Sequence, residues 1–271
     1  MGERPMQRVA IAGLGVIGWR VAEALNRGME PFALTAVSAN DRQKAEARLR
    51  ARGIAVPVLA IDELEPRADM VIECVPAKLF RQVAEPFLKN GKTVMTLSCG
   101  ALLANEDLVD LARKRGGQIV VPTGALIGLD AVTAAAEGQI HSVRMVTRKP
   151  VKSLLGAPYL LENGIDIESI QEPLRVFTGN AREAAVGFPA NLNVAVALSL
   201  AGIGPDRTQI EVWADPALER NTHRIEVEAD SARFSMEIAN VPSENNRTGR
   251  ITALSVISWL KKTSAPLRVG S

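Results

Sequence analysis

Short apolar runs alternate with amphipathic segments along the first 123 residues of the chain. The runs end in turn residues, which predicts strands at 7–12, 33–38, 57–59, 69–74, 93–97 and 118–121. The segments between them repeat apolar residues at helical spacing and predict helices at 16–28, 41–52, 78–88 and 104–115. Strands that alternate with helices in this way are typical of a parallel sheet with helices on both faces.

The pattern changes after Pro122. Apolar and polar residues alternate over longer stretches, which predicts strands with one solvated face at 141–147, 173–177, 207–213, 222–229 and 231–239. A small-residue segment at 124–137 and an Ala-rich segment at 181–201, ended by Gly202, predict two helices. The segment 248–262 has apolar residues at three-residue spacing and predicts an amphipathic C-terminal helix.

A glycine motif, Gly-Leu-Gly-Val-Ile-Gly, follows the first predicted strand at residues 13–18. Gly13 suits the tight turn after the strand, and Gly15 lets the backbone approach a pyrophosphate. Gly18 lets the following helix pack closely on the strand, and the first N–H groups of that helix, which includes Ile17, favour phosphate. Because the motif stands between a strand and a helix, we expect Gly13, Gly15, Ile17 and Gly18 to bind a dinucleotide.

These patterns together predict an α/β fold in three parts. Residues 1–123 form a Rossmann dinucleotide-binding domain. Residues 124–244 form a second, α+β domain for the substrate, with a mixed or antiparallel sheet. Residues 245–271 form a C-terminal helix that returns to the first domain.

The choice of dinucleotide depends on the end of the second predicted strand. NAD-specific folds usually carry an acid there, about 20 residues past the motif. This chain has Ser38, followed by Asn40, Asp41 and Arg42. A hydroxyl, an amide and a guanidinium can accommodate a 2′-phosphate, whereas Asp41 argues for NAD unless it caps the next helix. We therefore expect NAD or NADP as the cofactor.

Composition and charge indicate a globular protein that binds neither nucleic acid nor membranes. With 271 residues, 47% apolar, and a mean hydropathy of +0.07, the chain can bury a full core. A net charge of +2 gives no basis for nucleic-acid binding, and no apolar run approaches the ~20 residues that span a bilayer. The first residues contain no apolar signal segment, so we expect a cytoplasmic protein with neither nucleic acid nor membrane as partner.

The two cysteines, Cys74 and Cys99, match no metal-ligand spacing, and no metal site is predicted. We interpret both as buried thiols. The alternative is a catalytic thiolate at Cys99, because the carboxyl ends of parallel strands line the ligand crevice of such sheets.

The chain has two histidines, His141 and His223. His141 begins a predicted strand, where a surface position is the ordinary interpretation. His223 lies where a polar loop enters a strand, and Asn221 points to the same side at period two. An imidazole near its ordinary pKa is suited to moving protons in a redox reaction, which makes His223 the candidate catalytic residue.

A basic cluster of Arg148, Lys149 and Lys152 falls in a predicted loop. Fixed cations of this kind suit the carboxylates of an acidic substrate. A solvated surface is the alternative interpretation.

The chain resembles the L-aspartate dehydrogenase family over nearly its whole length. The resemblance is carried by the glycine motif and by the segments 98–101, 122–130, 147–150, 188–193, 213–216, 221–223 and 240–245. Its most specific parts are Phe-Pro-Ala-Asn at 188–191 and Asn-Thr-His at 221–223.

The resemblance implies an NAD(P)-dependent enzyme that interconverts L-aspartate with oxaloacetate and ammonia through iminoaspartate and feeds NAD biosynthesis. It implies that His223 is the catalytic histidine and that Ala125 and Asn191 contact the cofactor. It further implies a homodimer, formed through the second domain.

Other activities share parts of this pattern. A reductase of the dihydrodipicolinate-reductase type has the same two-domain plan, as does a semialdehyde dehydrogenase, which needs a reactive cysteine. A non-catalytic dinucleotide-binding sensor would keep the glycines without needing His223.

Overall fold

The computed structural model describes residues 5–189, 192–243 and 249–270. The chain divides into two compact units. Unit 1 runs to Pro122 and includes Ala253–Val269, and unit 2 consists mainly of Thr123–Thr252. In the described part of the chain, no helix combines the length and apolar character needed to cross a bilayer.

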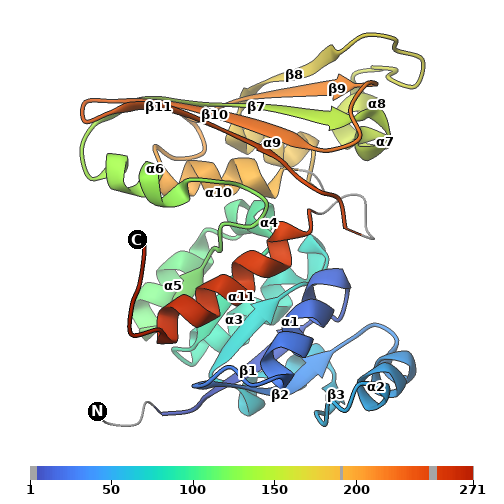
Figure 1. Cartoon of the computed structure of the whole chain (residues 1–271), viewed down its shortest axis with the longest axis vertical. Coiled ribbons are helices and arrows are strands. Elements are labelled where there is room, and N and C mark those ends of the chain that lie inside the picture. Colours follow the sequence, from blue (N-terminus) through green and yellow to red (C-terminus); the bar gives the residue numbers. More distant parts are fainter. Residues whose placement is uncertain (1–4, 190–191, 244–248, 271) are drawn as a thin grey trace. The chain divides into compact units, whose positions relative to one another are not determined.

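Unit 1 is built on one sheet of six parallel strands (Figure 1), in the order β3-β2-β1-β4-β5-β6. The central strand β1 is apolar and fully buried from Val9 to Ala12, as expected where helices cover both faces. The strand order reverses between β1 and β4, the kind of switch point at which such sheets bind ligands. The strands are β1 (Gln7–Ala12), β2 (Phe32–Ser38), β3 (Val58–Leu59), β4 (Met70–Glu73), β5 (Thr93–Thr96) and β6 (Gln118–Val120).

Helices form a separate apolar core on each face of this sheet. One core joins α1, α2 and α11 to Val9 and Ile11 of β1, and includes Val256 and Leu260 of α11. The other joins α3 and α5 to the opposite face of the same strands. The helices are α1 (Val16–Asn26), α2 (Arg42–Ala51), α3 (Phe80–Lys89), α4 (Cys99–Leu103), α5 (Asp107–Arg115) and α11 (Ile251–Ser264), with 3₁₀ turns η1 (Ile61–Glu63), η2 (Glu65–Arg67) and η3 (Ala77–Leu79).

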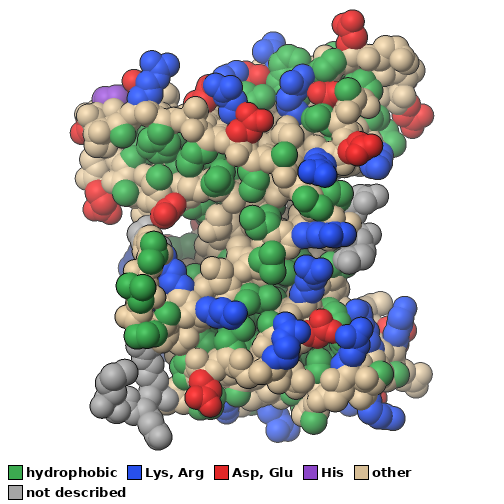
Figure 2. Space-filling model, viewed as in Figure 1, with side chains coloured by type: hydrophobic (Ala, Val, Ile, Leu, Met, Phe, Trp, Pro, Cys, Tyr) green, Lys and Arg blue, Asp and Glu red, His purple; other side chains and the backbone are tan. Residues whose placement is uncertain are grey.

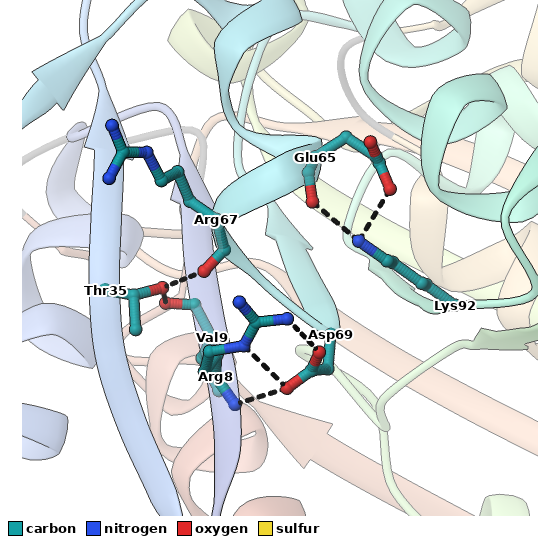
Figure 3. Close-up of polar contacts among 7 residues, drawn as sticks. All are labelled: Arg8, Val9, Thr35, Glu65, Arg67, Asp69 and Lys92. Carbon is teal, nitrogen blue, oxygen red and sulfur yellow. Dashed lines mark hydrogen bonds and ion pairs between the residues drawn. The ribbon is translucent and has the colours of Figure 1, made fainter.

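Ion pairs join strands at the amino end of this sheet (Figure 3). Arg8 donates to the Asp69 carboxylate from its backbone N–H, at 3.0 Å, and from its guanidinium, at 3.1 and 2.6 Å. Lys92, just before β5, pairs with Glu65 at 2.6 Å. The Arg8–Asp69 pair is exposed, and such pairs contribute about 0–1 kcal/mol, whereas both side chains of the Lys92–Glu65 pair are mostly buried. Because they occupy the amino end, the carboxyl ends of the strands remain for a ligand.

Unit 2 is built on a mixed sheet of five strands, in the order β11-β10-β7-β9-β8. β7 and β9 are parallel, and the other neighbours are antiparallel. Helices α6, α9 and α10 lie on one face (Figure 1) and share a core with it. The elements are α6 (Leu129–Ala136), β7 (Ile140–Pro150), α7 (Val151–Leu154), α8 (Pro158–Glu162), β8 (Leu174–Asn180), α9 (Ala181–Gly187), α10 (Asn193–Ala201), β9 (Gln209–Asp215), β10 (Thr222–Ala229) and β11 (Arg233–Ala239).

The side of this sheet away from the helices carries charges of both signs (Figure 2). Arg144 pairs with Glu211 and Glu226, each at 2.8 Å, and Arg224 also pairs with Glu226, at 3.0 Å. A charged outer face and an apolar helix-facing side are the ordinary arrangement for a one-sided sheet. A polar residue buried on the helix-facing side is therefore the exception that indicates a site.

The parallel sheet of unit 1 and the mixed sheet of unit 2 confirm the predicted fold class. One helix was predicted wrongly, however: the segment 181–201 is two helices, with α9 ending at Gly187 and α10 beginning at Asn193. Phe188 leaves the helical conformation, with φ −135° and ψ 55°, because it precedes Pro189.

Two further boundaries differ from the prediction. The helix expected at 104–115 is a pair, α4 and α5, and α4 begins at Cys99. The loop expected to hold Arg148 and Lys149 is the end of β7, which continues to Pro150. The period-two pattern of this strand therefore extends past residue 147, where the prediction ended it.

Candidate functional site

The glycine motif forms the turn between β1 and α1. Gly13 has φ +97°, and a Cβ there would lie 2.6 Å from the carbonyl oxygen of Cys74. A Cβ on Gly18 would collide with the carbonyl oxygen of Gly13. A Cβ on Gly15 would meet nothing within 4 Å. Gly13 and Gly18 are thus required by the fold itself, whereas Gly15 borders open space of the kind a dinucleotide needs.

Helix α1 begins at this turn, with Gly15 as its N-cap. Among the described residues no side chain caps it, and its first turn contains no acid. Ile17 is half-buried and packs against the core below. The first N–H groups and the positive end of the helix dipole are therefore suited to a pyrophosphate, and the residues present fit a dinucleotide.

The end of β2 differs from what the sequence suggested. Ser38 is buried, and its hydroxyl accepts a hydrogen bond from the Gly13 N–H at 3.2 Å, so it holds the glycine turn. Asp41 caps α2 by accepting from the Lys44 N–H at 2.9 Å. Asn40 and Arg42 are exposed as well, but Arg42 pairs with Glu46 at 2.8 Å, so Asn40 is the side chain better suited to a ribose 2′ substituent.

A buried carboxyl group, Glu73, joins the carboxyl ends of β4 and β5. It accepts hydrogen bonds from the hydroxyl of Thr96 at 2.9 Å and from both the N–H and the hydroxyl of Ser98 at 3.0 Å. The N–H groups of Val75, at 3.0 Å, and Leu97, at 3.2 Å, also donate to it. Burial raises the pKa of Glu73, and the hydrogen bonds oppose that rise. These contacts fix the two loops that border the ligand end of the sheet.

The cysteines do not provide a thiolate. Cys99 begins α4 and is buried, and burial raises the pKa of its thiol to about 12. Burial also raises the pKa of Cys74 well above its ordinary value. Both thiols are protonated at neutral pH, which argues against a nucleophile at Cys99. The described residues also contain no group of three or more His, Cys, Asp or Glu placed to hold a metal ion.

In unit 2, one end of the helix-facing side of the sheet is polar. Val143, Met145, Thr147 and Lys149 take successive positions on this side of β7, and all four are buried. On β10, His223 lies directly opposite Thr147. The apolar core therefore gives way to a hydroxyl, an ammonium and an imidazole at this end.

His223 is 2% exposed, and its Nδ1 lies 2.7 Å from Oγ1 of Thr147. The Thr147 hydroxyl also lies 3.5 Å from the carbonyl oxygen of Thr222. When the hydroxyl donates to that carbonyl, Nδ1–H donates to the hydroxyl oxygen, and Nε2 keeps the lone pair that a base needs.

The titration of His223 departs from the expectation of an ordinary pKa. Burial, together with the positive charge of Lys149, lowers the pKa of His223 to about 3. The imidazole is therefore neutral at physiological pH in the unliganded protein.

The predicted basic cluster is divided between the two sides of the sheet. Arg148 is on the outer side, where it pairs with Asp215 at 3.4 Å. Lys149 is 2% exposed on the helix-facing side, and burial lowers its pKa to about 8. No carboxylate among the described residues forms an ion pair with Lys149. Lys152 lies in α7 and borders a cavity.

That cavity has mostly polar walls, formed by Pro150, Lys152, Ser153, Glu219, Asn221, Asn240, Pro242 and Gly249. The Oδ1 atoms of Asn221 and Asn240 are buried, with no hydrogen-bond partner in the part of the chain that the structure describes. The orientation of the Asn240 amide follows from its Nδ2, which donates to the carbonyl oxygen of Ala125 at 2.9 Å. Buried acceptors without donors point to a ligand or water that donates to them.

The predicted site residues within the described ranges lie in both units. Gly13, Gly15, Ile17 and Gly18 lie together in unit 1. In unit 2, the Asn240 N–H donates to the carbonyl oxygen of Asn221 at 2.8 Å, and the Asn240 side chain donates to the carbonyl oxygen of Ala125. Asn240 therefore connects Ala125 to Asn221, which lies two residues before His223. Exposed His141 is at the other end of β7.

Asn191 lies outside the described residues, as do Ala190, Glu244 and Asn245 of the segments that carry the resemblance. Sequence reasoning also missed three residues that the structure brings into the site. Thr147 and Asn240 lie beside predicted site residues, and Glu73 fixes two loops of unit 1. The even spacing of Val143, Met145 and Thr147 was the one signal that could have found Thr147.

Comparison with protein families covers both units. Residues 130–263 match the family described as "Aspartate dehydrogenase, C-terminal", and residues 13–122 match "Homoserine dehydrogenase, NAD binding domain".

Individual relatives span the whole chain. An L-aspartate dehydrogenase of Bradyrhizobium diazoefficiens is 60% identical over 264 residues, which cover 97% of this chain and 94% of the relative. L-aspartate dehydrogenase 3 of Bordetella bronchiseptica is 54% identical over 272 residues and covers 100% of both. The crystal structure of an aspartate dehydrogenase from Thermotoga maritima has a TM-score of 0.72 at 23% identity, covers 97% of this chain and 99% of its own, and shares the fold.

Proposed function

The chain belongs to the L-aspartate dehydrogenase family, and from that premise we propose that it oxidises L-aspartate to iminoaspartate with NAD or NADP. Water then converts the imine to oxaloacetate and ammonia, and the enzyme also runs the reverse amination. The observation that carries this proposal is the buried pair of His223 and Thr147 beside Lys149, at the polar end of an otherwise apolar sheet face. Buried titratable groups of this kind are typical of a reaction centre.

Unit 1 is proposed to hold the dinucleotide. The turn at Gly13 and Gly15 and the N-terminus of α1 suit the pyrophosphate, and exposed Asn40, with Arg42 two residues later, is proposed to face the ribose. A bound dinucleotide would supply, in its nicotinamide, the acceptor for the hydride that leaves the substrate Cα. Ala125 and Asn191 are proposed as further cofactor contacts on the resemblance to the family.

His223 is proposed to handle the protons. Formation of the imine needs a neutral amine, and hydrolysis needs a water whose proton is removed as its oxygen attacks the imine carbon. Nε2 of His223 accepts that proton, while Nδ1 stays bonded to Thr147, and the proton then passes to the departing nitrogen.

Charge explains how a histidine with so low a pKa serves as a base. Lys149 and burial keep His223 neutral in the unliganded protein. A substrate with two carboxylates brings negative charge to the site, which offsets Lys149 and raises the pKa of the imidazole. The same charge that binds the substrate thus restores basicity to His223.

The test is the reduction of NAD⁺ and NADP⁺ with a panel of the twenty amino acids, beside oxidation of NADH and NADPH with oxaloacetate and ammonium. We expect L-aspartate to be the preferred amino acid and the reverse reaction to require ammonium. No reduction of either nucleotide with L-aspartate would contradict the proposal. A folded protein that binds NADH yet turns over no amino acid would favour a non-catalytic sensor.

On the resemblance alone, we further propose that the protein is a homodimer and that its iminoaspartate supplies NAD biosynthesis. Sedimentation of the purified protein measures the oligomer. Trapping of iminoaspartate before hydrolysis measures whether the imine leaves the site.

A further inference from the structure

Lys149 is a buried cation without an anion. It is 2% exposed on the helix-facing side of β7, where its neighbours on the same side are apolar residues and Thr147. Burying an ammonium without a partner is costly, and proteins keep such groups where they serve a function. In the part of the chain described here, no carboxylate pairs with it.

Asp215 is the carboxylate nearest to Lys149 in the strand register, and it already has other partners. Asp215 lies opposite Pro150, accepts from the Ala217 N–H at 3.0 Å and pairs with Arg148 at 3.4 Å. Arg148 approaches it from the outer side of the sheet, where its side chain is 45% exposed. The protein therefore neutralises Arg148 and leaves Lys149, the next residue, unneutralised.

Lys149 lies beside the pair of Thr147 and His223, and residues that follow it in the sequence, though not Lys149 itself, line the cavity. Thr147, two residues earlier on the same side, contacts His223, and the charge of Lys149 reaches the imidazole strongly enough to lower its pKa. Pro150 and Ser153, which follow Lys149 in the sequence, line the cavity that also contains the unpartnered amide oxygens of Asn221 and Asn240. The cavity has a volume of about 20 Å³, room for about one water molecule, so we expect a substrate carboxylate at the unneutralised ammonium of Lys149 rather than inside the cavity.

We infer that Lys149 is the anchor for one carboxylate of the substrate, directly beside the proton-handling histidine. The inference rests on the proposed function for the identity of the substrate, but the ligand chemistry, a small dicarboxylate, follows from the unneutralised ammonium. It also makes Lys149 a specificity residue: an uncharged side chain would not supply the cation that the substrate carboxylate needs.

The experiment compares Lys149→Met, which keeps the length of the side chain, with Lys149→Arg, which keeps the charge. Arg224→Gln is the matched control, because it removes one charge from the opposite side of the same sheet beside His223. Binding of succinate, a dicarboxylate without an amine, is measured by calorimetry in the presence of NADH. KM and kcat for L-aspartate, the affinity for NADH and the Tm are measured alongside.

We expect Lys149→Met to weaken succinate binding about 100-fold and to raise KM for L-aspartate comparably, because a desolvated charge pair is lost. NADH affinity should be unchanged, and Tm should not fall, since an unpaired buried charge has been removed. Lys149→Arg should recover part of the affinity, and the control should match the wild type.

Succinate binding by the variants tests the inference about Lys149 independently of the proposed function. Unchanged succinate affinity in folded Lys149→Met overturns the inference, even if the wild type oxidises L-aspartate. Lost succinate binding supports it, even if the wild type does not turn over L-aspartate, in which case only the proposed function fails. If neither Lys149→Met nor Lys149→Gln folds, Lys149 is a structural residue and the inference is wrong.

Discussion

Thr147 and His223 face each other across neighbouring antiparallel strands, with Oγ1 of one 2.7 Å from Nδ1 of the other. Both are buried on the side of the sheet that otherwise forms the apolar core of unit 2. The contact orients the ring without placing a charge behind it, and it sets the tautomer when the Thr147 hydroxyl donates to the Thr222 carbonyl. An uncharged orienting residue leaves the basicity of Nε2 to be set by Lys149 and by the ligand.

The first prediction concerns this orienting contact. Thr147→Val keeps the shape of the side chain but removes the hydroxyl, so Nδ1 of the imidazole loses its hydrogen-bond partner. We expect kcat for L-aspartate to fall by about 10- to 100-fold, with KM and NADH affinity little changed. Thr147→Ser should restore most of the rate. Equal rates for Thr147→Val and the wild type would show that the contact does not serve the reaction.

The second prediction tests His223 itself. General acid–base catalysis is typically worth about 10²- to 10⁴-fold, and His223→Ala should lower kcat by that amount. NADH binding, measured by fluorescence titration, should be unaffected, because the glycine turn proposed to bind the dinucleotide belongs to unit 1. His141→Ala is the control, since His141 is exposed at the start of β7. Near-wild-type turnover by folded His223→Ala would make the histidine structural.

Much of unit 1 could be predicted from the sequence because its signals are local. The strand, the glycines and the helix of residues 7–26 follow each other without interruption, and Gly13 and Gly18 each have a steric reason at their own position. The hydrogen bond of Ser38 could not be predicted, because its partner, the Gly13 N–H, is 25 residues away in the sequence. Only the fold places that donor beneath the hydroxyl.

The site in unit 2 could be predicted only in part, because it depends on contacts between strands that are far apart in the sequence. His223 was found because histidine is rare in this chain, but its neighbours depend on strand pairing. Lys149 and Arg148 are adjacent in sequence and identical in charge, yet a strand directs them to opposite sides. Because the strand was predicted to end at residue 147, both were placed in a loop.

The third prediction separates two glycines of the motif. Gly15→Val adds a side chain where the protein has open space, so the fold should survive while dinucleotide binding is abolished. Gly13→Val forces a Cβ against the carbonyl oxygen of Cys74 at φ +97° and should instead destabilise the protein. Tm and NADH titration of both variants provide the measurement. Wild-type affinity in Gly15→Val would place the pyrophosphate elsewhere.

The fourth prediction concerns the choice between NAD and NADP. Asn40 is exposed after β2, and no acid other than the helix cap Asp41 is near it in the sequence. Asn40→Asp should shift the ratio of kcat/KM toward NAD, because a carboxylate repels the 2′-phosphate and can bind the 2′-hydroxyl. Ser38→Asp should disturb the glycine turn and weaken both cofactors, since Ser38 faces Gly13. An unchanged ratio in Asn40→Asp would mean that the ribose lies away from this residue.

The last prediction is a pH dependence of stability that originates in His223. Its pKa is about 3 in the folded protein, against 6.5 for an imidazole in its ordinary, solvated state, so between these values the unfolded chain binds more protons. The free energy of unfolding should therefore rise with pH across this window. The contribution from His223 should be up to about 1.4 kcal/mol per pH unit and be complete above pH 6.5.

The pH dependence of His223 has to be separated from that of the carboxylates. Asp69 and Glu226, for example, also titrate in acid, with lowered pKa values. The measurement is therefore the difference between urea unfolding of the wild type and of His223→Leu, from about pH 4 to about pH 8. We expect the two curves to diverge as the pH falls below 6.5, because the variant has no proton to bind, and to run parallel above it. Curves parallel throughout would mean that water reaches the imidazole and that its burial does not govern its charge.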